Sequence, residues 1–240
     1  MNLIIDIGNT KTKIALFSNN EIVHHVSYFN AETSNIAEEI KQAKADKAII
    51  SAVREIDKEI EKAIENKGIE CLRFDHETCV PVKNKYKTPN TLGYDRLASV
   101  IGAYSNNKGR DILVIDAGTC ITYDFINKEG EFLGGNISPG VEMRLEAMHT
   151  MTSKLPRVDK IGDVPSMGYD TETAIRAGVM KGIEYEIRGY VEEMTKKYGD
   201  VLCFLTGGEH FSFDTKLKNT IFADNFLLIK GLNYILNYNI

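Results

Sequence analysis

Two stretches of the chain, 110 residues apart, carry the residue types that hold a phosphate group and its metal ion. Residues 3–17 are LIIDIGNTKTKIALF, and residues 113–125 are LVIDAGTCITYDF. Aligning Asp6 with Asp116 also aligns Gly8 with Gly118. Each stretch is an apolar run followed by an acid and a glycine turn. A buried strand that folds back there as a hairpin brings a carboxylate, bare backbone N–H groups and a hydroxyl or amide to one turn. Such groups bind phosphate and metal ions.

In the first turn each residue type has a possible role at a phosphate. Asp6 could hold Mg²⁺ through water, and Lys13 returns on the next strand as a point charge. Gly8 lets the backbone approach an oxyanion, while Asn9 and Thr10 add hydrogen-bond donors. The alternative is a tight hairpin whose Asp and Asn only satisfy the turn geometry. The repeat favours phosphate binding over that alternative.

Three further clusters combine polar residues with glycines. The second stretch continues into Thr122 and Asp124 and then into GGNISPG at 134–140, where glycines allow a phosphate or a cation to lie against the backbone. Gly93-Tyr94-Asp95-Arg96 begins a predicted helix. Adjacent residues of a helix point apart, so Asp95 and Arg96 would not pair with each other and both could face a cleft. The alternative is that Asp95, in the first turn, only interacts with the helix dipole. On the residues alone that second interpretation is favoured. Thr206-Gly207-Gly208 ends a predicted strand, where open α/β folds bind ligands.

The hydrophobic pattern predicts the elements that position these clusters. In the first half it predicts a three-strand meander that is followed by helix, strand, helix and strand, in the order β-β-β-α-β-α-β. The expected strands are 2–7, 13–18, 21–28, 48–53 and 69–74, with helices from Ser34 to about 43, from 56 to 64 and from 93 to 105. The second half repeats the theme with strands 112–115, 122–126, 131–134 and 201–205, and helices 140–150, 171–197 and 226–236. We expect an α/β fold with two domains, 1–106 and 107–240, each with a mixed sheet.

The composition excludes several classes of protein. The chain has 240 residues and a net charge of −5, without a block of Lys and Arg, which argues against nucleic-acid binding. Its four cysteines never form a CxxC pair. No signal peptide or membrane-spanning run is evident, so we expect a cytoplasmic protein without membrane contact. Neither a GxxxxGK[ST] loop nor a GxGxxG fingerprint occurs, which disfavours P-loop NTPases and Rossmann dehydrogenases.

Taken together, the motifs resemble one family within the superfamily of acetate kinases, sugar kinases, Hsp70 and actin. DIGNTKTK, GYDR, DAGTCITYD, GGNISPG and the late Asp170-Thr171-Glu172 follow one another in the order found in type III pantothenate kinases. The resemblance runs from residue 3 to about residue 208, and the combination is specific although no single motif is.

The resemblance implies a fold, a reaction and a set of roles. It implies two ribonuclease H-like domains with a nucleotide cleft between them, a homodimer, and transfer of phosphate from ATP to pantothenate, with Mg²⁺ and a monovalent cation, K⁺ or NH₄⁺. Asp95 would accept the proton and Asp116 would hold the monovalent cation. The residues implied for ATP are Asp6, Gly8, Asn9, Thr10, Lys13 and Thr119. Those implied for pantothenate are Tyr86, Gly93, Tyr94, Asp95, Arg96 and Thr171.

Two alternatives remain open. The first is another small-molecule kinase of the same superfamily, against which the GYDR helix start and the short chain argue. The second is a non-catalytic relative that acts as a transcription accessory factor. Such a protein would be expected to lose Asp6, Asp95 or Asp116, and all three are present.

Overall fold

The chain forms two compact units in the computed structural model, which describes residues 1–209, 211 and 221–240. Unit 1 comprises Met1–Lys108, Gly130–Phe132 and Phe226–Ile240, and unit 2 comprises Gly109–Glu129 and Leu133–Asn225. The division into domains 1–106 and 107–240 stays a prediction. Sequence reasoning did not foresee that the last residues of the chain pack with the first.

A five-stranded mixed sheet forms the centre of unit 1. Its strand order is β3-β2-β1-β4-β5, and β1 pairs antiparallel with β2 and parallel with β4. Because β1 has a neighbour on each side and both faces covered, its sequence is almost continuously apolar. The strands are β1 (Asn2–Ile7), β2 (Lys11–Ser18), β3 (Glu21–Phe29), β4 (Lys47–Ala52) and β5 (Glu70–Arg73).

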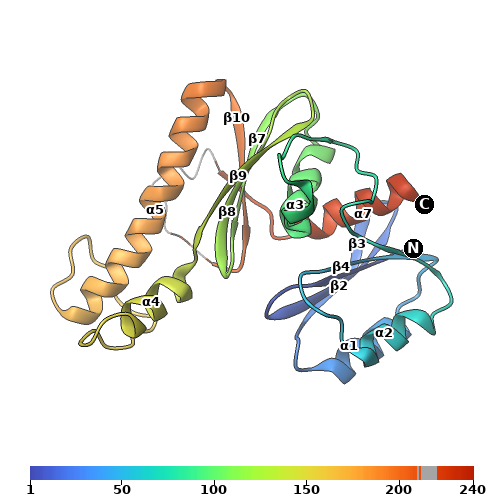
Figure 1. Ribbon diagram of the computed structural model, residues 1–240, viewed down its shortest axis with the longest axis horizontal. Helices are drawn as coiled ribbons and strands as arrows, with labels where there is room; N and C mark the ends of the chain where they lie inside the picture. Colours follow the sequence, from blue (N-terminus) through green and yellow to red (C-terminus); the bar gives the residue numbers. More distant parts are fainter. Residues whose placement is uncertain (210, 212–220) are drawn as a thin grey trace. The chain divides into compact units, whose positions relative to one another are not determined.

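Two amphipathic helices, α1 (Thr33–Gln42) and α2 (Lys58–Glu65), cover one face of this sheet (Figure 1). Their apolar residues recur every three or four positions, which places them on one side of each helix. That side is buried against the odd-numbered residues of β1. The buried cluster includes Leu3, Ile5, Ile7, Ile36, Ile40, Ile60 and Ile64.

The opposite face of the sheet carries α7 (Leu227–Asn239), which packs against β1 and β4 and also against α3 (Tyr94–Ser105). Successive side chains of a strand point to opposite faces, so Asn2, Ile4 and Asp6 project toward this side. The Asn2 side-chain amide accordingly donates a hydrogen bond to Asn233 of α7 at 2.7 Å. Asp6 therefore projects from the same face of the sheet as the contact with α7.

The segment before α3 contains two short elements that the sequence pattern did not predict. They are β6 (Lys83–Asn84) and the 3₁₀ turn η1 (Pro89–Thr91). β6 pairs parallel with residues 131 and 132, which belong to unit 1. A strand of only two residues, such as β6, is too short to show the alternation of apolar and polar residues from which strands are predicted.

A second mixed sheet forms the centre of unit 2. Its strand order is β11-β10-β7-β8-β9-β6, in which β6 is the short strand already described. β7 pairs antiparallel with β8 and parallel with β10, as β1 does with β2 and β4. The strands are β7 (Asp111–Ala117), β8 (Cys120–Ile126), β9 (Glu131–Pro139), β10 (Val201–Gly207) and β11 (Ile221–Ala223). The sequence repeat is therefore a repeat of topology.

Helices α4 (Val141–Thr150) and α5 (Thr171–Tyr198) share one core with this sheet (Figure 1). The apolar face predicted for the long helix lies in that core. Its buried members are Ile175, Val179, Ile183, Ile187 and Val191, together with Leu113, Ile115, Tyr123 and Leu145 from the other elements. The expectation of a mixed α/β fold with two mixed sheets is confirmed. None of the helices in the described part of the chain has the length and apolar character needed to span a bilayer.

Candidate functional site

Asp6 lies near the carboxyl end of β1, in the middle of a polar row. Its register partners are Lys13 on β2 and Ser51 on β4. Register partners on adjacent strands project from the same face of a sheet, so the three side chains are neighbours. Asp6 is 4% exposed, and the fully buried Ser51 hydroxyl has no hydrogen-bond partner in the described part of the chain. The row thus combines a carboxylate, an ammonium group and an unsatisfied hydroxyl.

The turn that follows Asp6 is braced by a side chain from the end of β3. The Asn30 side-chain amide donates to the backbone carbonyls of Gly8 at 2.9 Å and Asn9 at 3.0 Å. Its carbonyl oxygen accepts a hydrogen bond from Thr12 at 2.9 Å. Asn9 and Thr10 are exposed. The turn is therefore fixed by the protein itself, with its polar groups open to solvent.

The start of α3 holds the Asp95 carboxylate in a defined place. Gly93 is the N-cap residue, and a Cβ atom there would lie 2.5 Å from Asp95 Oδ1. A side chain at position 93 would therefore displace the Asp95 carboxylate from this place. The same oxygen accepts the backbone N–H of Arg96 at 2.8 Å, and the positive end of the helix dipole favours a negative charge at this position.

Tyr86 and Arg96, ten residues apart in the sequence, come together. The guanidinium carbon of Arg96 lies 5.8 Å from the centroid of the Tyr86 ring, and that ring lies 6.2 Å from the ring of Phe132. Arg96 is only 7% exposed. The structure thus groups Tyr86 with the Gly93–Arg96 segment, all of them residues implied for pantothenate.

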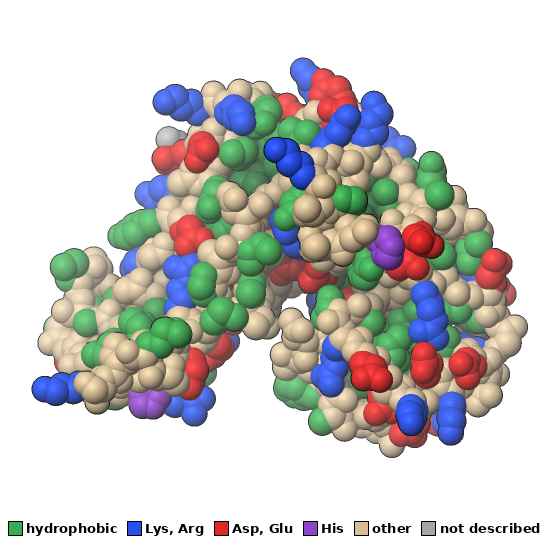
Figure 2. All heavy atoms as spheres, viewed as in Figure 1, with side chains coloured by type: hydrophobic (Ala, Val, Ile, Leu, Met, Phe, Trp, Pro, Cys, Tyr) green, Lys and Arg blue, Asp and Glu red, His purple; other side chains and the backbone are tan. Residues whose placement is uncertain are grey.

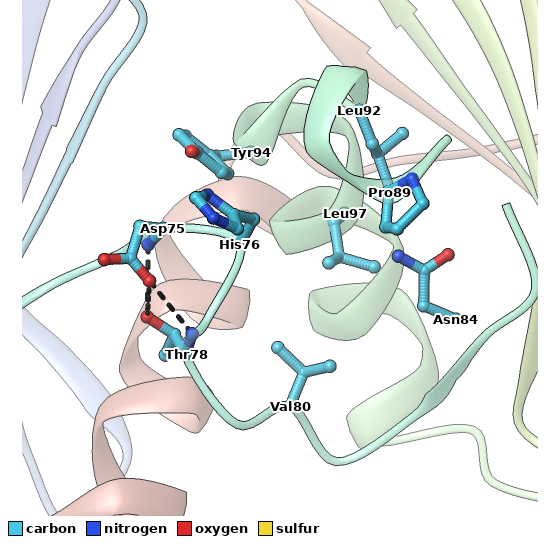
Figure 3. Close-up of a pocket in the computed structure, with 9 residues that line it drawn as sticks. All are labelled: Asp75, His76, Thr78, Val80, Asn84, Pro89, Leu92, Tyr94 and Leu97. Carbon is cyan, nitrogen blue, oxygen red and sulfur yellow. Dashed lines mark hydrogen bonds between the residues drawn. The ribbon is translucent and has the colours of Figure 1, made fainter. Parts of the chain in front are cut away.

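A cavity of about 190 Å³ lies beside this segment in unit 1 (Figure 3). Of the residues implied for pantothenate only Tyr94 lines it, and the Tyr94 ring also packs on Phe74 at 5.4 Å. One end of the wall is polar, where Asp75 is hydrogen bonded to Thr78. The lining residues are Asp75, His76, Thr78, Val80, Asn84, Pro89, Leu92, Tyr94 and Leu97.

In unit 2, Asp116 lies in a second polar row. Its register partners are Thr122 on β8 and Thr206 on β10. Asp116 is half-buried and Thr206 is 5% exposed. The row places a carboxylate between two hydroxyl-bearing residues, all of them oxygen ligands of the kind that hard cations prefer.

The turn after Asp116 is enclosed by backbone from two other segments. The N–H of Gly140 donates to the carbonyl of Thr119 at 3.1 Å, and a Cβ at Gly140 would lie 2.3 Å from the carbonyl oxygen of Gly118. From the other side, Gly207 has a φ of +101°, and a Cβ there would lie 2.3 Å from the carbonyl oxygen of Ala117. Thr119 remains exposed at the tip.

Thr171 is the exposed first residue of α5. Asp170 caps this helix by accepting the backbone N–H of Thr173 at 2.8 Å, and that hydrogen bond lowers the pKa of Asp170. The loop before the helix is tied down by Arg176, whose Nε donates to the carbonyl of Asp159 at 2.8 Å. The backbone of Thr171 is therefore held in place, and its side chain is exposed to solvent.

Among residues 1–209, 211 and 221–240 there is no group of three or more His, Cys, Asp or Glu side chains that could hold a metal ion. Each polar row instead offers a single carboxylate. Mg²⁺ in phosphate-transfer sites takes one or two carboxylates and fills its other positions with phosphate oxygens and water. The rows fit a metal ion that arrives with a phosphate ligand.

Sequence reasoning missed two residues of the first row and turn. Ser51 lies in the predicted strand 48–53. Its equivalent in the repeat is Thr206, which the sequence did single out, so the repeat could have identified Ser51 as well. Asn30 lies two residues beyond the predicted strand 21–28, the third strand of the meander, and this position was the available signal.

Solved structures with a similar fold show the fold class of the chain. A Baf family protein from Campylobacter jejuni is 21% identical, with a TM-score of 0.64 and coverage of 99% of this chain and 98% of that one. A ROK family glucokinase from Streptomyces griseus, in complex with glucose and AMPPNP, is 10% identical, with a TM-score of 0.52 over 99% and 98% of the two chains. At these identities the similarity concerns the fold alone. The chain has the fold of the sugar kinases.

The sequence relatives are much closer than the structural ones. The family model of type III pantothenate kinase matches residues 2–193. A type III pantothenate kinase of Bacteroides fragilis is 53% identical over 239 residues, covering 100% of this chain and 98% of the relative. One of Phocaeicola vulgatus is 50% identical, covering 100% and 99%. The chain belongs to the type III pantothenate kinase family, which confirms the resemblance found in the sequence.

Proposed function

We propose that this protein transfers the γ-phosphoryl group of ATP to the primary hydroxyl of pantothenate, the first step of coenzyme A biosynthesis. Membership of the type III pantothenate kinase family over the whole chain carries the proposal. The site chemistry supports it. Phosphoryl transfer depends on positioning and on charge neutralisation more than on covalent chemistry, and the two polar rows with their fixed turns can supply both.

The ATP phosphates are assigned to the first turn and to Thr119. Gly8, Asn9, Thr10 and Lys13 offer backbone N–H groups, side-chain donors and a positive charge. Asp6 would hold Mg²⁺ through water, and the ion when bound neutralises charge on the phosphate oxygens. The buried Ser51 hydroxyl is in register with Asp6 and has no hydrogen-bond partner among the residues that the structure describes, which supports a polar occupant beside this row.

The chemical step is assigned to Asp95. Its carboxylate is placed by the missing side chain of Gly93 and by the N–H of Arg96. A carboxylate held in this way can orient the pantothenate hydroxyl and accept its proton. Tyr86, Gly93, Tyr94, Arg96 and Thr171 are assigned to the rest of pantothenate. The contact between Tyr86 and the Arg96 guanidinium supports this grouping.

Asp116 is assigned to a monovalent cation, K⁺ or NH₄⁺. Its half-buried carboxylate lies in register with Thr122 and Thr206, so oxygen ligands flank it on both neighbouring strands. Unlike the first row, this row brings no Lys or Arg of its own. A bound cation would lie against this carboxylate and the two threonine hydroxyl groups.

A homodimer is also part of the proposal. Unit 2 exposes large apolar side chains around α4 and α5, and Figure 2 shows hydrophobic side chains at the surface of this part. Met151 is 84% exposed and Met167 is 83% exposed, and exposed apolar patches of this kind mark interaction sites. The others are Ile137, Met143, Ile161, Tyr169 and Tyr185. The need for ATP supports a cytoplasmic location.

A coupled assay that measures ADP release tests the proposed reaction. We expect ADP release only when pantothenate is present, with a product heavier than pantothenate by one phosphoryl group in mass spectrometry. ADP release that is equal with and without pantothenate contradicts the proposal. Release that depends on a sugar instead would show another kinase of the fold, and absence of both activity and ATP binding would show a non-catalytic relative.

A further inference from the structure

A cluster of four polar side chains connects both helices of unit 2 to its sheet. Glu186 of α5 accepts hydrogen bonds from Tyr123 of β8 at 2.9 Å, from Ser138 of β9 at 2.5 Å and from Arg144 of α4 at 2.6 Å. Three donors from three different elements thus converge on one carboxylate. The Glu186 side chain is 25% exposed and that of Arg144 is 22% exposed, so water screens the pair only in part.

The charges of this cluster are fixed near neutral pH. Burial by itself would raise the pKa of Glu186, but the hydrogen bonds from Arg144, Ser138 and Tyr123 outweigh burial and leave the pKa lowered. Burial and the hydrogen bond to Glu186 raise the pKa of Tyr123, which therefore keeps its proton and donates. A charged acceptor with three donors makes stronger and more directional contacts than a neutral one.

The cluster is linked to the turn after Asp116 through two further hydrogen bonds. Arg144 also donates from Nε to the carbonyl of Pro139 at 2.7 Å. The next residue, Gly140, donates its N–H to the carbonyl of Thr119 at 3.1 Å. A Cβ at Gly140 would lie 2.6 Å from that same carbonyl oxygen, so the two backbones are in direct contact. A movement of residues 138–140 must therefore move the turn.

We propose that Glu186 is a positioning residue for phosphoryl transfer. It holds Arg144 and Ser138, these hold the 138–140 segment, and that segment holds Thr119 where the ATP phosphates bind. The inference rests on the proposed function, which assigns Thr119 to ATP. Misplacing a reacting group by about 1 Å can lower a rate by about 10²-fold, so a carboxylate that touches neither substrate can still set the rate.

Glu186→Gln tests this role because it keeps the size of the side chain and removes the charge. We expect kcat to fall by about 10-fold to 100-fold, the range found when a group that orients a ligand is lost. The KM for ATP should rise, and the KM for pantothenate should stay the same. Asp200→Asn is the matched control, since it breaks another Asp/Glu–Arg pair of unit 2, with Arg110 at 2.7 Å, before the first residues of β7 and β10 and at the opposite end of these strands from Asp116 and Thr206. It should change none of the three constants.

Two milder changes guard against a variant that does not fold. Ser138→Ala removes one donor to Glu186, and Tyr123→Phe removes another while keeping the ring that stacks on Tyr190 at 4.0 Å. Each should shift kcat and the KM for ATP in the same direction as Glu186→Gln, by a smaller factor. Combining Glu186→Gln with Arg144→Gln should be little worse than either change alone, because both break one chain of contacts.

Thermal unfolding of every variant separates positioning from stability. The inference is overturned if folded Glu186→Gln protein loses thermal stability but keeps the wild-type kcat and KM for ATP. It is also overturned if the KM values for ATP and pantothenate rise together. If wild-type protein binds ATP but does not phosphorylate pantothenate, the proposed function fails. The role of Glu186 is then decided by comparing the calorimetric ATP affinity of folded Glu186→Gln protein with that of wild-type protein: weaker binding supports the role, and equal binding overturns it. Wild-type protein that binds no ATP would overturn both.

Discussion

The turn after Asp6 and the turn after Asp116 occupy equivalent places in two sheets of the same topology, yet the second hairpin is one residue shorter. Asp6 pairs with Lys13, whereas Asp116 pairs with Thr122, the position before the residue that the alignment would match to Lys13. Side chains alternate between the faces of a strand, so one residue of length changes which side chain lies beside the acid. The first row has a Lys there, and the second has a Thr.

The two turns also differ in what holds them. A single side chain, that of Asn30, braces the first turn and leaves its tip exposed. Two glycine segments press their backbones against the second turn, at Gly140 and Gly207. The two copies of the repeated hairpin thus differ: the turn in unit 1 has a lysine beside its acid, and the turn in unit 2 is held by contacts with the backbone of two other segments. We expect substitutions in the first turn to change ATP binding, and substitutions of the glycines that clamp the second turn to lower stability.

The largest effect is expected outside both turns, at Asp95. Asp95→Asn keeps the size of the side chain but removes the proton acceptor. Positioned general-base catalysis contributes about 10²–10⁴-fold, so turnover should fall by that factor while calorimetry shows nearly unchanged ATP affinity. If the variant keeps more than about a tenth of wild-type turnover, below that range, Asp95 has a structural role only.

The next largest effect is expected at Lys13, which gives the first row its positive charge. A hydrogen bond to a charged group contributes about 1.5–3 kcal/mol, so Lys13→Ala should raise the KM for ATP by about 10-fold to 100-fold. Lys11→Ala is the control, because Lys11 lies over the Phe29 ring at 4.8 Å and is exposed. Equal KM values for ATP in both variants would place the phosphates elsewhere.

The clamp on the second turn can be broken at Gly207. A Cβ there meets the Ala117 carbonyl at 2.3 Å, and the φ of +101° is unfavourable for any other residue. Gly207→Ala should lower the free energy of unfolding by about 1–3 kcal/mol, the usual range for overpacking. Gly208→Ala should be neutral in thermal and denaturant unfolding, because among the described residues no atom beyond the two chain neighbours lies within 4 Å of the added Cβ. A neutral Gly207→Ala would show that the turn is not clamped.

The smallest effect is a pH dependence of stability in unit 2. The pKa of Glu186 is lowered in the fold from its usual value of 4.5. Its contribution to stability is therefore present above pH 4.5 and is lost as the pH falls through the lowered pKa. Melting temperatures measured at a series of pH values below 4.5 should fall less steeply for Glu186→Gln than for wild-type protein. Parallel curves would show that the carboxylate contributes nothing to folding.

Features that depend on local sequence were predictable, whereas those that depend on distant partners were not. The two acid-glycine turns and the long helix 171–197 could be read because their patterns lie within one element. Glu186 lies on that helix, and nothing in the sequence sets it apart from the other charged residues there. Its partners Arg144 and Tyr123 are 42 and 63 residues away, and no periodicity links them. The packing of the last helix, α7, with unit 1 joins the two ends of the chain, so a division into consecutive segments could not represent it.

Calorimetric ATP affinity of two variants, Lys13→Ala and Thr119→Val, tests most directly the claim that both repeated turns serve the nucleotide. Each variant should bind Mg·ATP more weakly than wild-type protein and should bind pantothenate normally, with unchanged thermal unfolding. Wild-type ATP affinity in folded Lys13→Ala protein would contradict the role of the first turn. Wild-type ATP affinity in folded Thr119→Val protein would contradict the role of the second, and the repeat would then be structural in that half.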